Sequence, residues 1–274
     1  MRQLFVRDLY PRLAARPIAE IEAPELLQVI HKIEARGALD TAHRALQNAG
    51  AVFRYAVATQ RAKRDPSQDL KGALQPVKGE HIAAVIDPTE LGELLRAIDS
   101  YQGNGQSVVG YALKMLAYTF PRPAELRFAC WSEIDLKAEN AVWRLPAKRT
   151  RMKDGHVIPL APQMVELLKE LRPISGKQML FPSTRHGGRP ISDGTLSAAL
   201  SAMGFDGKTH AKHVARGFRA TASTFLNELG YAPDLIELSL AHKERKQIRA
   251  AYNRAQRLAE RRVLMHGGAT APGR

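Results

Sequence analysis

The sequence predicts a mainly α-helical protein of two domains, with one small antiparallel β-sheet in the second domain. Three observations predict this fold class. Apolar residues recur at helical spacing over most of the chain, prolines and glycines interrupt that spacing between residues 66 and 79, and residues 141–160 change to the spacing of strands. The chain has 274 residues, which is enough for one large domain or two modest ones.

Residues 1–75 are predicted to be helical. Leu26, Ile30 and Ile33 fall on one face of a helix that ends at Gly37. A longer helix follows, for which Asp40 is a suitable N-cap. Its apolar stripe is predicted to comprise Ala42, Leu46, Ala49, Val52, Phe53, Ala56 and Val57. Basic residues lie on its other face or just beyond its end, and they fit either a solvated surface or a DNA-facing one: Arg44, Arg54, Arg61, Lys63 and Arg64.

Residues 76–86 are predicted to be a linker, and residues 87–265 a second, larger domain. Asp87-Pro88-Thr89-Glu90 has the composition of a helix start. Two strands are predicted at about 141–146 and 156–160, with Asp154-Gly155 as the hairpin turn between them. Further helices are predicted at about 108–120, 163–171, 192–203, 217–229, 233–240 and 244–264. The glycine-rich residues 266–274 are predicted to form a disordered tail.

The chain is strongly basic, with 41 lysines and arginines against 27 acidic residues and a net charge of +14. That balance favours a polyanionic partner such as nucleic acid over a merely soluble basic protein. The basic residues are spread along the chain and not gathered on one amphipathic helix, which disfavours a membrane surface. The single cysteine, Cys130, excludes an intrachain disulfide, and no signal peptide or membrane-spanning apolar run is recognisable, so we expect a cytoplasmic protein.

Four residues in a fixed order indicate chemistry on a phosphodiester. Arg122 and Arg219 can grip the non-bridging oxygens of a phosphate with planar guanidinium groups, and His242 can add a hydrogen bond. Tyr252, ten residues after His242, has a hydroxyl that can attack phosphorus. Each residue alone also has an ordinary structural explanation, and Tyr252 lies on an apolar helical stripe as a core tyrosine would. Together the four favour DNA breakage and rejoining without a metal.

With the motifs around them, these residues resemble the tyrosine recombinases and, within that family, the prophage integrases. The resemblance runs from about Pro17 to Ala255. It is most specific in four segments: Arg122-Pro123-Ala124-Glu125-Leu126-Arg127, Trp131-Ser132-Glu133-Ile134-Asp135-Leu136, Gly217-Phe218-Arg219-Ala220-Thr221-Ala222-Ser223-Thr224 and Leu240-Ala241-His242.

The resemblance implies a site-specific DNA recombinase, or integrase, that needs no metal and no cofactor. By this resemblance Arg122 and Arg219 clamp the scissile phosphate and His242 hydrogen-bonds to it. Tyr252 is the implied nucleophile, which forms a 3′-phosphotyrosine link, and Glu125 supports the local structure. The fold it implies is a helical core-type DNA-binding domain followed by an α-rich catalytic domain.

Two positions depart from the family pattern. Arg216 stands where the family usually has a histidine, and arginine cannot act as a general base because it stays protonated at neutral pH. His213, three residues earlier, does not fit the register of the motif. In the hairpin, the position of the family's lysine acid falls on Arg151, and arginine is a poor proton donor. Lys153, two residues on, is our candidate substitute, and Lys148 is a further one.

The implied partners are double-stranded DNA at attachment sites and further copies of the chain, as a homotetramer on paired DNA sites in the bacterial nucleoid. Host DNA-bending and excision accessory proteins can also take part. We expect the chain to lack the family's N-terminal arm-binding domain, to begin inside the core-binding domain, and to lack the usual tryptophan-containing tail. Two alternatives remain open: a catalytically impaired DNA-binding prophage remnant, and a relaxing topoisomerase that uses the same tyrosine chemistry.

Overall fold

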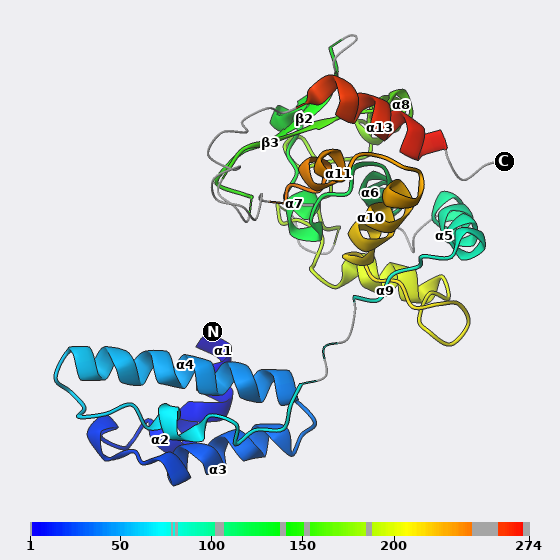
Figure 1. Ribbon diagram of the computed structural model, residues 1–274. Coiled ribbons are helices and arrows are strands. Elements are labelled where there is room, and N and C mark those ends of the chain that lie inside the picture. Colours follow the sequence, from blue (N-terminus) through cyan, green and yellow to red (C-terminus); the bar gives the residue numbers. More distant parts are fainter. Residues whose placement is uncertain are drawn as a thin grey trace. The chain divides into compact units, whose positions relative to one another are not determined.

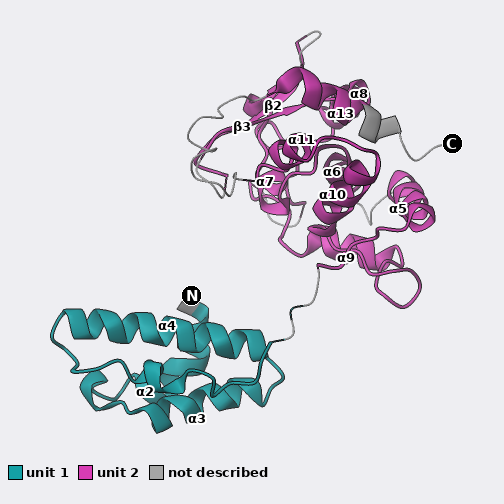
Figure 2. Cartoon of the chain, viewed as in Figure 1, with its two compact units in different colours: residues 1–80 teal, residues 81–274 magenta. Residues whose placement is uncertain are grey.

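The computed structural model describes residues 2–77, 79, 82–101, 107–137, 141–150, 154–184, 188–242 and 257–270. The chain divides into two compact units, residues 1–80 and residues 81–274 (Figure 2). Helices predominate in both units, and the second unit also holds a small antiparallel sheet (Figure 1). The fold class predicted from the sequence is therefore confirmed. Among the described residues, no helix combines the length and the apolar character needed to cross a membrane.

The first unit is built around two helices that pack against each other, α3 (Ala23–Glu34) and α4 (Leu39–Ala58). Leu26, Ile30 and Ile33 of α3 are buried in its core, as their spacing predicted, and Phe53 of α4 packs with them. The shorter elements of this unit are α1 (Arg2–Leu4), the π-helical turn η1 (Phe5–Leu9), α2 (Tyr10–Leu13) and the 3-10 turns η2 (Ile18–Glu20) and η3 (Pro66–Leu70).

Two expectations about the long helix α4 are wrong. Ala38 is its N-cap, and Asp40 lies within the first turn, where its carboxylate pairs with Arg44 at 2.9 Å. Val52 and Val57 do not belong to the buried stripe, because their side chains are 42% and 37% exposed. The apolar residues of this helix span more than one face, and only the face toward α3 is covered.

The second unit is arranged around α6 (Ser107–Thr119), whose apolar residues are buried from Val108 to Leu116. This helix contacts helices that come from the whole length of the unit, so it forms the centre of the core. Its neighbours are α5 (Pro88–Ser100), α7 (Pro123–Arg127), α8 (Pro162–Leu171), α9 (Thr195–Ala202), α10 (Gly217–Glu228) and α13 (Leu258–Thr270). A further helix, α11 (Pro233–Ser239), contacts α10 and α13. The predicted start of α5 is confirmed, because the Asp87 side chain accepts a hydrogen bond from the Glu90 N–H at 3.0 Å.

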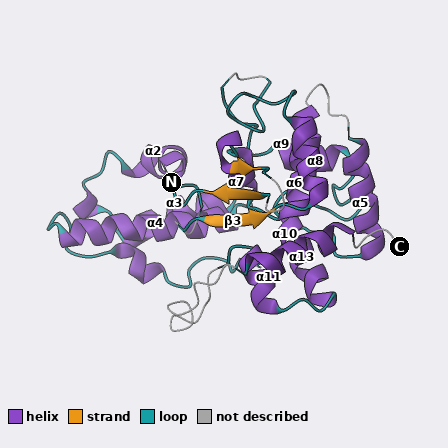
Figure 3. Ribbon diagram, turned by 90° about the horizontal axis from the view of Figure 1, so that it is seen from above, coloured by secondary structure: helices purple, strands orange, loops and turns teal. Residues whose placement is uncertain are grey.

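The sheet has the strand order β1 (Ile134–Asp135), β2 (Val142–Leu145) and β3 (His156–Pro159), and all pairings are antiparallel (Figure 3). The 3-10 turn η4 (Trp131–Glu133) leads into β1, which the sequence patterns did not predict. Trp143 of β2 is fully buried, and its indole N–H donates to Glu133 Oε2 at 3.1 Å.

The connection between β2 and β3 has nearly the bounds that the two predicted strands imply. Leu145 pairs with His156, so residues 146–155 lie between the strands, and Asp154-Gly155 is not a two-residue hairpin turn. The Thr150 hydroxyl donates to the Asp154 carbonyl at 2.7 Å and joins the two sides of this connection. An interaction across the loop therefore replaces the tight turn that the Asp-Gly pair suggested.

Helix α13 runs to Thr270 and so enters the segment, residues 266–274, for which the sequence predicted a disordered tail. Leu264 and Met265 are buried in the core of the unit. A helix fixed in this way extends over the next turn at little cost, because propagation is easier than nucleation. Residues 271–274 lie outside the described part of the chain, as do residues 244–256 of the helix predicted at 244–264.

Candidate active site

Arg122 lies at the start of α7, where the chain leaves the central helix α6. It occupies the N-cap position, and the Glu125 carboxylate binds it twice, accepting from the Arg122 backbone N–H at 2.9 Å and from Nη1 at 3.1 Å. Glu125 is only 4% exposed. A buried carboxylate needs a charged or hydrogen-bonding partner, so Glu125 and Arg122 hold each other in place.

Arg219 of α10 reaches two other parts of the chain. Its Nη1 donates to the Phe120 carbonyl at 2.8 Å, and its Nη2 donates to the Leu240 carbonyl and to His242 Nε2, the latter at 2.9 Å. Burial, followed by the charge of Arg122, lowers the pKa of Arg219 to about 10. The guanidinium therefore stays protonated at neutral pH while being poorly hydrated, a state that strengthens its attraction for an anion.

His242 lies three residues beyond the end of α11, in a turn whose carbonyls bind both Arg122 and Arg219. The Ala241 backbone has a positive φ of 50°, and its carbonyl accepts a hydrogen bond from Arg122 Nη2 at 3.3 Å. The His242 N–H returns to the Glu237 carbonyl at 2.9 Å, and the His242 Nδ1 pairs with Glu237 Oε2 at 2.7 Å. The structure thus brings Arg122, Arg219 and His242 together, although 120 positions separate the first from the last.

Arg216 and His213, which both shortly precede Arg219 in the sequence, have different surroundings. Arg216 is the N-cap of α10 with an exposed side chain, and its charge contributes to the lowered pKa of Arg219. His213 is buried, its Nδ1 accepts a hydrogen bond from the Val85 N–H at 2.9 Å, and burial lowers its pKa to about 4. His213 is therefore a core residue, whereas Arg216 lies on the surface near Arg122 and Arg219, which are called the arginine pair below.

Three predicted site residues, Tyr252, Lys153 and Arg151, lie outside the described residues. Lys148, the further lysine considered for the hairpin acid, is exposed in the connection between β2 and β3.

Arg149 is a neighbour of the site that the sequence motifs did not indicate. Its Nη1 donates to the Glu125 carbonyl at 3.2 Å, and its Nη2 pairs with the Glu133 carboxylate. This guanidinium therefore fastens the connection between β2 and β3 to the helix that begins at Arg122. No local pattern could have identified it, because its partners are remote in sequence.

Arg261, Ser239 and His156 form a second group that the sequence motifs did not indicate. Arg261 of α13 is 2% exposed, with Nε 3.3 Å from Ser239 Oγ and Nη2 3.4 Å from His156 Nε2. Burial, followed by the positive charge of Arg261, lowers the pKa of His156 to about 3. These residues join α13 to α11 and to β3.

Glu237 is the missed residue closest to the predicted chemistry, since it binds His242 directly. A weak signal for it exists in the sequence. A carboxylate five positions before a candidate histidine, on a helix that ends between them, lies within reach of the imidazole.

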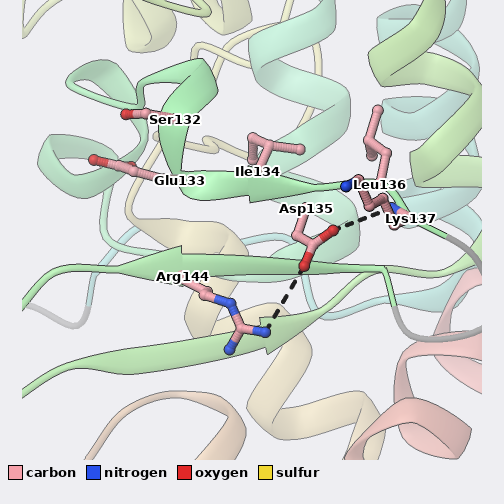
Figure 4. Close-up of a pocket in the computed structure, with 7 residues that line it drawn as sticks. All are labelled: Ser132, Glu133, Ile134, Asp135, Leu136, Lys137 and Arg144. Carbon is pink, nitrogen blue, oxygen red and sulfur yellow. Dashed lines mark hydrogen bonds and ion pairs between the residues drawn. The ribbon is translucent and has the colours of Figure 1, made fainter.

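A shallow cavity of about 580 Å³ lies elsewhere in this unit, beside β1 (Figure 4). Asp135 is bound within the cavity, with its Oδ2 3.9 Å from Arg144 Nη2 and its Oδ1 accepting from the Lys137 backbone N–H at 3.1 Å. The lining residues are Ser132, Glu133, Ile134, Asp135, Leu136, Lys137 and Arg144. None of the predicted site residues lines this cavity, so it is not where the phosphate chemistry was expected.

The arrangement around Arg219 can bind one phosphate group. Two guanidinium groups and an imidazole converge there, and backbone carbonyls and Glu125 fix the guanidinium planes. Fixed donors of this kind stabilise the negative charge that develops on phosphate oxygens during nucleophilic attack. The site therefore has the donor set for phosphoryl transfer to a protein nucleophile.

Comparison with known proteins gives two family matches. Residues 1–73 match the family model described as phage integrase central domain, and residues 84–258 match the phage integrase family. The integrase of Enterobacteria phage P4 is 36% identical over 272 residues, covering 94% of this chain and 60% of that protein. The chain thus spans about three fifths of the length of the curated relatives it matches first.

Solved structures give a matching fold. A lambda integrase fragment, crystallised as a dimer bound to a COC′ core site, aligns with a TM-score of 0.65 and 17% identity, covering 94% of this chain and 85% of that one. A lambda integrase tetramer bound to a Holliday junction aligns with a TM-score of 0.65 and 18% identity, covering 92% and 70% of the two chains.

Proposed function

Because this chain belongs to the phage integrase family of tyrosine recombinases, we propose that it cuts and rejoins DNA at specific sites through a 3′-phosphotyrosine intermediate. The observation that carries the proposal is the convergence of Arg122, Arg219 and His242 on one site. In this proposal the arginines clamp the scissile phosphate and His242 hydrogen-bonds to it. Tyr252 attacks phosphorus, and the 5′ oxygen leaves with a proton from Lys153 or Arg151 of the hairpin.

The supporting residues act through this clamp. Glu125 orients Arg122 through two hydrogen bonds and does not touch the phosphate. Arg216 takes the place of the family's usual histidine and contributes positive charge from the edge of the site. The arginine pair, Arg122 and Arg219, is retained, and hydrogen bonds to the chain hold both guanidinium groups in place. This favours an active recombinase over a catalytically impaired remnant, since an unused clamp would not need to be kept or positioned.

We also propose that residues 1–75 form a core-type DNA-binding domain and residues 87–265 the catalytic domain, joined by a linker at 76–86. The match of residues 1–73 to the integrase central domain supports the first assignment. In that unit Arg44, Arg54 and Arg64 each pair with carboxylates of the same chain. The pairs of Arg44 with Asp40 and of Arg64 with Glu22 are exposed on both sides and therefore weak, so DNA phosphates can displace these carboxylates as the duplex binds.

Double-stranded attachment-site DNA is the proposed substrate, and four copies of the chain on two DNA sites form the proposed active assembly. The lambda integrase structures on a core site and on a Holliday junction support both proposals. Host DNA-bending and excision proteins are proposed as accessory partners, and the bacterial cytoplasm, at the nucleoid, as the place of action.

Covalent trapping tests the function. Purified protein is incubated with nicked suicide duplexes cut from the attachment region of the host chromosome, beside a Tyr252→Phe variant, and run on a denaturing gel. A slower protein–DNA band that requires Tyr252 is expected. DNA binding without any adduct, on duplexes that a longer relative does cleave, would instead support the impaired remnant.

A further inference from the structure

Glu237, His242 and Arg219 form a line of hydrogen bonds at the candidate active site. Glu237 Oε2 lies 2.7 Å from His242 Nδ1, and His242 Nε2 lies 2.9 Å from Nη2 of Arg219. The backbone adds a second link, because the His242 N–H donates to the Glu237 carbonyl at 2.9 Å. The imidazole is therefore held at both ring nitrogens, by an anion on one side and by a cation on the other.

These two partners determine the protonation state of the imidazole in the unbound protein. The pKa of Arg219, about 10, keeps its guanidinium protonated at neutral pH, and a guanidinium has no acceptor atom. Arg219 Nη2 therefore donates and His242 Nε2 accepts. Nδ1 then carries the hydrogen of the neutral ring and donates it to Glu237. The Nε2 lone pair is thus occupied by Arg219 as long as no phosphate is bound.

A bound phosphate changes what His242 Nε2 faces. Phosphate oxygens are stronger acceptors than an imidazole nitrogen, so they take over the hydrogen bond from Arg219 Nη2. In the proposed function His242 hydrogen-bonds to the same phosphate, but an Nε2 lone pair and a phosphate oxygen are both acceptors. Their contact becomes a hydrogen bond once Nε2 gains a proton. The imidazole side chain is 42% exposed, so solvent can supply that proton.

We infer that binding of the scissile phosphate is coupled to the uptake of one proton by His242, and that Glu237 is the positioning residue that makes this uptake possible. The inference rests on the proposed function and deepens it. No bond to phosphorus forms or breaks in this step. Arg219 exchanges His242 for a phosphate oxygen as its acceptor, and Nε2 takes a proton from solvent and donates it to the phosphate. Glu237 accepts from Nδ1–H before and after the exchange and offsets the new positive charge.

The charges around the imidazole explain why its protonation depends on the phosphate and on Glu237. The arginines oppose a further positive charge, His156 stays neutral because burial and Arg261 lower its pKa to about 3, and the carboxylates favour the charge. Glu237 binds the ring directly, whereas the Glu125 carboxylate is bound to Arg122. The charged and titratable groups of the neighbouring elements, within the described part of the chain, are Arg122 and Glu125 at α7, Arg216 and Arg219 at α10, Glu237 of α11, His156 of β3 and Arg261 of α13.

The coupling fixes the direction of the pH dependence of binding. The bound state holds one proton more than the free state, so affinity for the site is highest at low pH and falls as the pH rises. Full uptake of one proton corresponds to about tenfold in the dissociation constant per pH unit. Glu237→Gln removes the charge that stabilises the bound imidazolium, so less proton is taken up and the affinity depends less on pH.

NMR spectroscopy of the full chain with isotope-labelled histidine nitrogens observes the protonation state directly, and a His242→Asn variant assigns the signals. In the free protein we expect a protonated Nδ1 and an unprotonated Nε2. In the complex with a duplex cut from the attachment region, both nitrogens should carry protons. The complex is made with the Tyr252→Phe variant so that the DNA stays intact. A protonated Nε2 in the free protein, or an unprotonated Nε2 in the complex, would overturn the inference.

Fluorescence anisotropy on the same duplex, between about pH 6.5 and 8.5 at constant salt, measures the coupling and the role of Glu237. Wild-type affinity should fall more steeply with rising pH than that of Glu237→Gln, by ~3- to 10-fold per pH unit, and Glu237→Asp should keep most of the wild-type slope. Glu228→Gln changes the charge equally at an exposed glutamate at the end of α10, and this matched control should keep the full slope. Parallel profiles, with Glu237→Gln weaker by one factor at every pH, would assign Glu237 a structural role and overturn the inference.

Failure of this inference and failure of the proposed function give different results. If the wild-type protein forms the covalent adduct while Glu237→Gln keeps the wild-type pH dependence of binding, the inference alone is wrong. If the wild-type protein forms no adduct on duplexes that a longer relative cleaves, the proposed function itself fails.

Discussion

Arg219 is held by groups from three separate parts of the chain: the Phe120 carbonyl, the Leu240 carbonyl and His242. A lysine at this position keeps the charge but has one ammonium group, which cannot reach all three partners and grip a phosphate as well. We expect Arg219→Lys to slow formation of the covalent DNA adduct by about 10²-fold or more, while DNA affinity falls only slightly.

Single-turnover cleavage and a gel-shift titration on the same duplex separate these two effects. Arg172→Lys is a suitable control, because Arg172 stacks on Trp131, away from the arginine pair. Equal losses of rate in the two variants would show that the multiple contacts of Arg219 have no special role.

Two buried histidines link the stability of the second unit to pH. Burial lowers the pKa of His213 to about 4, and burial together with Arg261 lowers the pKa of His156 to about 3, from an ordinary value of 6.5. The unfolded chain therefore binds these protons at a higher pH than the folded one. The contribution of each neutral histidine to the free energy of unfolding is fully present above about pH 6.5. It is lost as the pH falls toward 4 for His213 and toward 3 for His156. The loss for His213 alone reaches about 3 kcal/mol.

Urea unfolding measured at several pH values checks this, with tryptophan fluorescence as the signal because Trp131 and Trp143 both belong to the second unit. The free energy of unfolding should decline from about pH 6.5 downward. In the His213→Phe variant the free energy of unfolding should decline less steeply with falling pH, because unfolding then takes up one proton fewer. The same slope in both proteins would mean that His213 does not titrate in this range.

At the scale of elements, the start of α10 determines where Arg216 and Arg219 lie. Segment 83–85 binds that start: the Thr221 hydroxyl donates to the Val85 carbonyl at 2.6 Å, and the Val214 N–H donates to the Ala83 carbonyl at 3.3 Å. Gly217 lies against the same segment, and a methyl group there would overlap the Ala83 carbonyl oxygen. This contact explains why glycine occupies a buried position in the first turn of a helix.

We therefore expect Gly217→Ala to lower the free energy of unfolding by about 1–3 kcal/mol, despite the better helix propensity of alanine. The displaced helix start should also reduce cleavage, since Arg219 moves with it. Gly194→Ala at the N-cap of α9, where an added Cβ would meet nothing within 4 Å, is the control. Urea midpoints by tryptophan fluorescence measure both, and a stabilised Gly217→Ala protein would refute the clash.

Elements with a strong local signal could be predicted from the sequence. The buried face of α3 and the cap at Asp87 follow from spacing and from a single side-chain hydrogen bond. The strand β1 has two residues, which are defined as a strand by their pairing with Trp143 and Val142 of β2, so no local pattern indicates it. The extent of α13 depends on buried Leu264, which glycine content alone does not reveal.

The same limit applies to the candidate site. Motif order identified Arg122, Arg219 and His242, and the structure brings these three together, while their catalytic roles remain predictions. Glu237 and Arg149 could not be assigned roles from the sequence, since each matters through a partner that only the fold provides.

At the scale of the whole molecule, two compact units and a net charge of +14 suit a protein that holds duplex DNA mainly by its phosphates. If about six or more phosphates are contacted, affinity should fall by ~10³-fold or more between about 50 and 200 mM salt. Fluorescence anisotropy on a labelled duplex at a series of salt concentrations measures the slope. Residues 1–80 expressed alone should give a smaller slope, and salt-insensitive binding by the whole chain would contradict phosphate-dominated contact.

The hydrogen bond from the Thr150 hydroxyl to the Asp154 carbonyl bears on how homologous sequences are aligned. It joins the two sides of the loop just outside the strand pairing of Leu145 with His156, so we expect insertions and deletions between these two residues to leave that pairing unchanged. Placing the hairpin acid at Arg151 by its position in the family pattern therefore assumes a constant loop length, which this hydrogen bond does not require. An alignment of this family should place its gaps between positions 150 and 154 and match lysines within the loop by type, whatever their distance from the following strand.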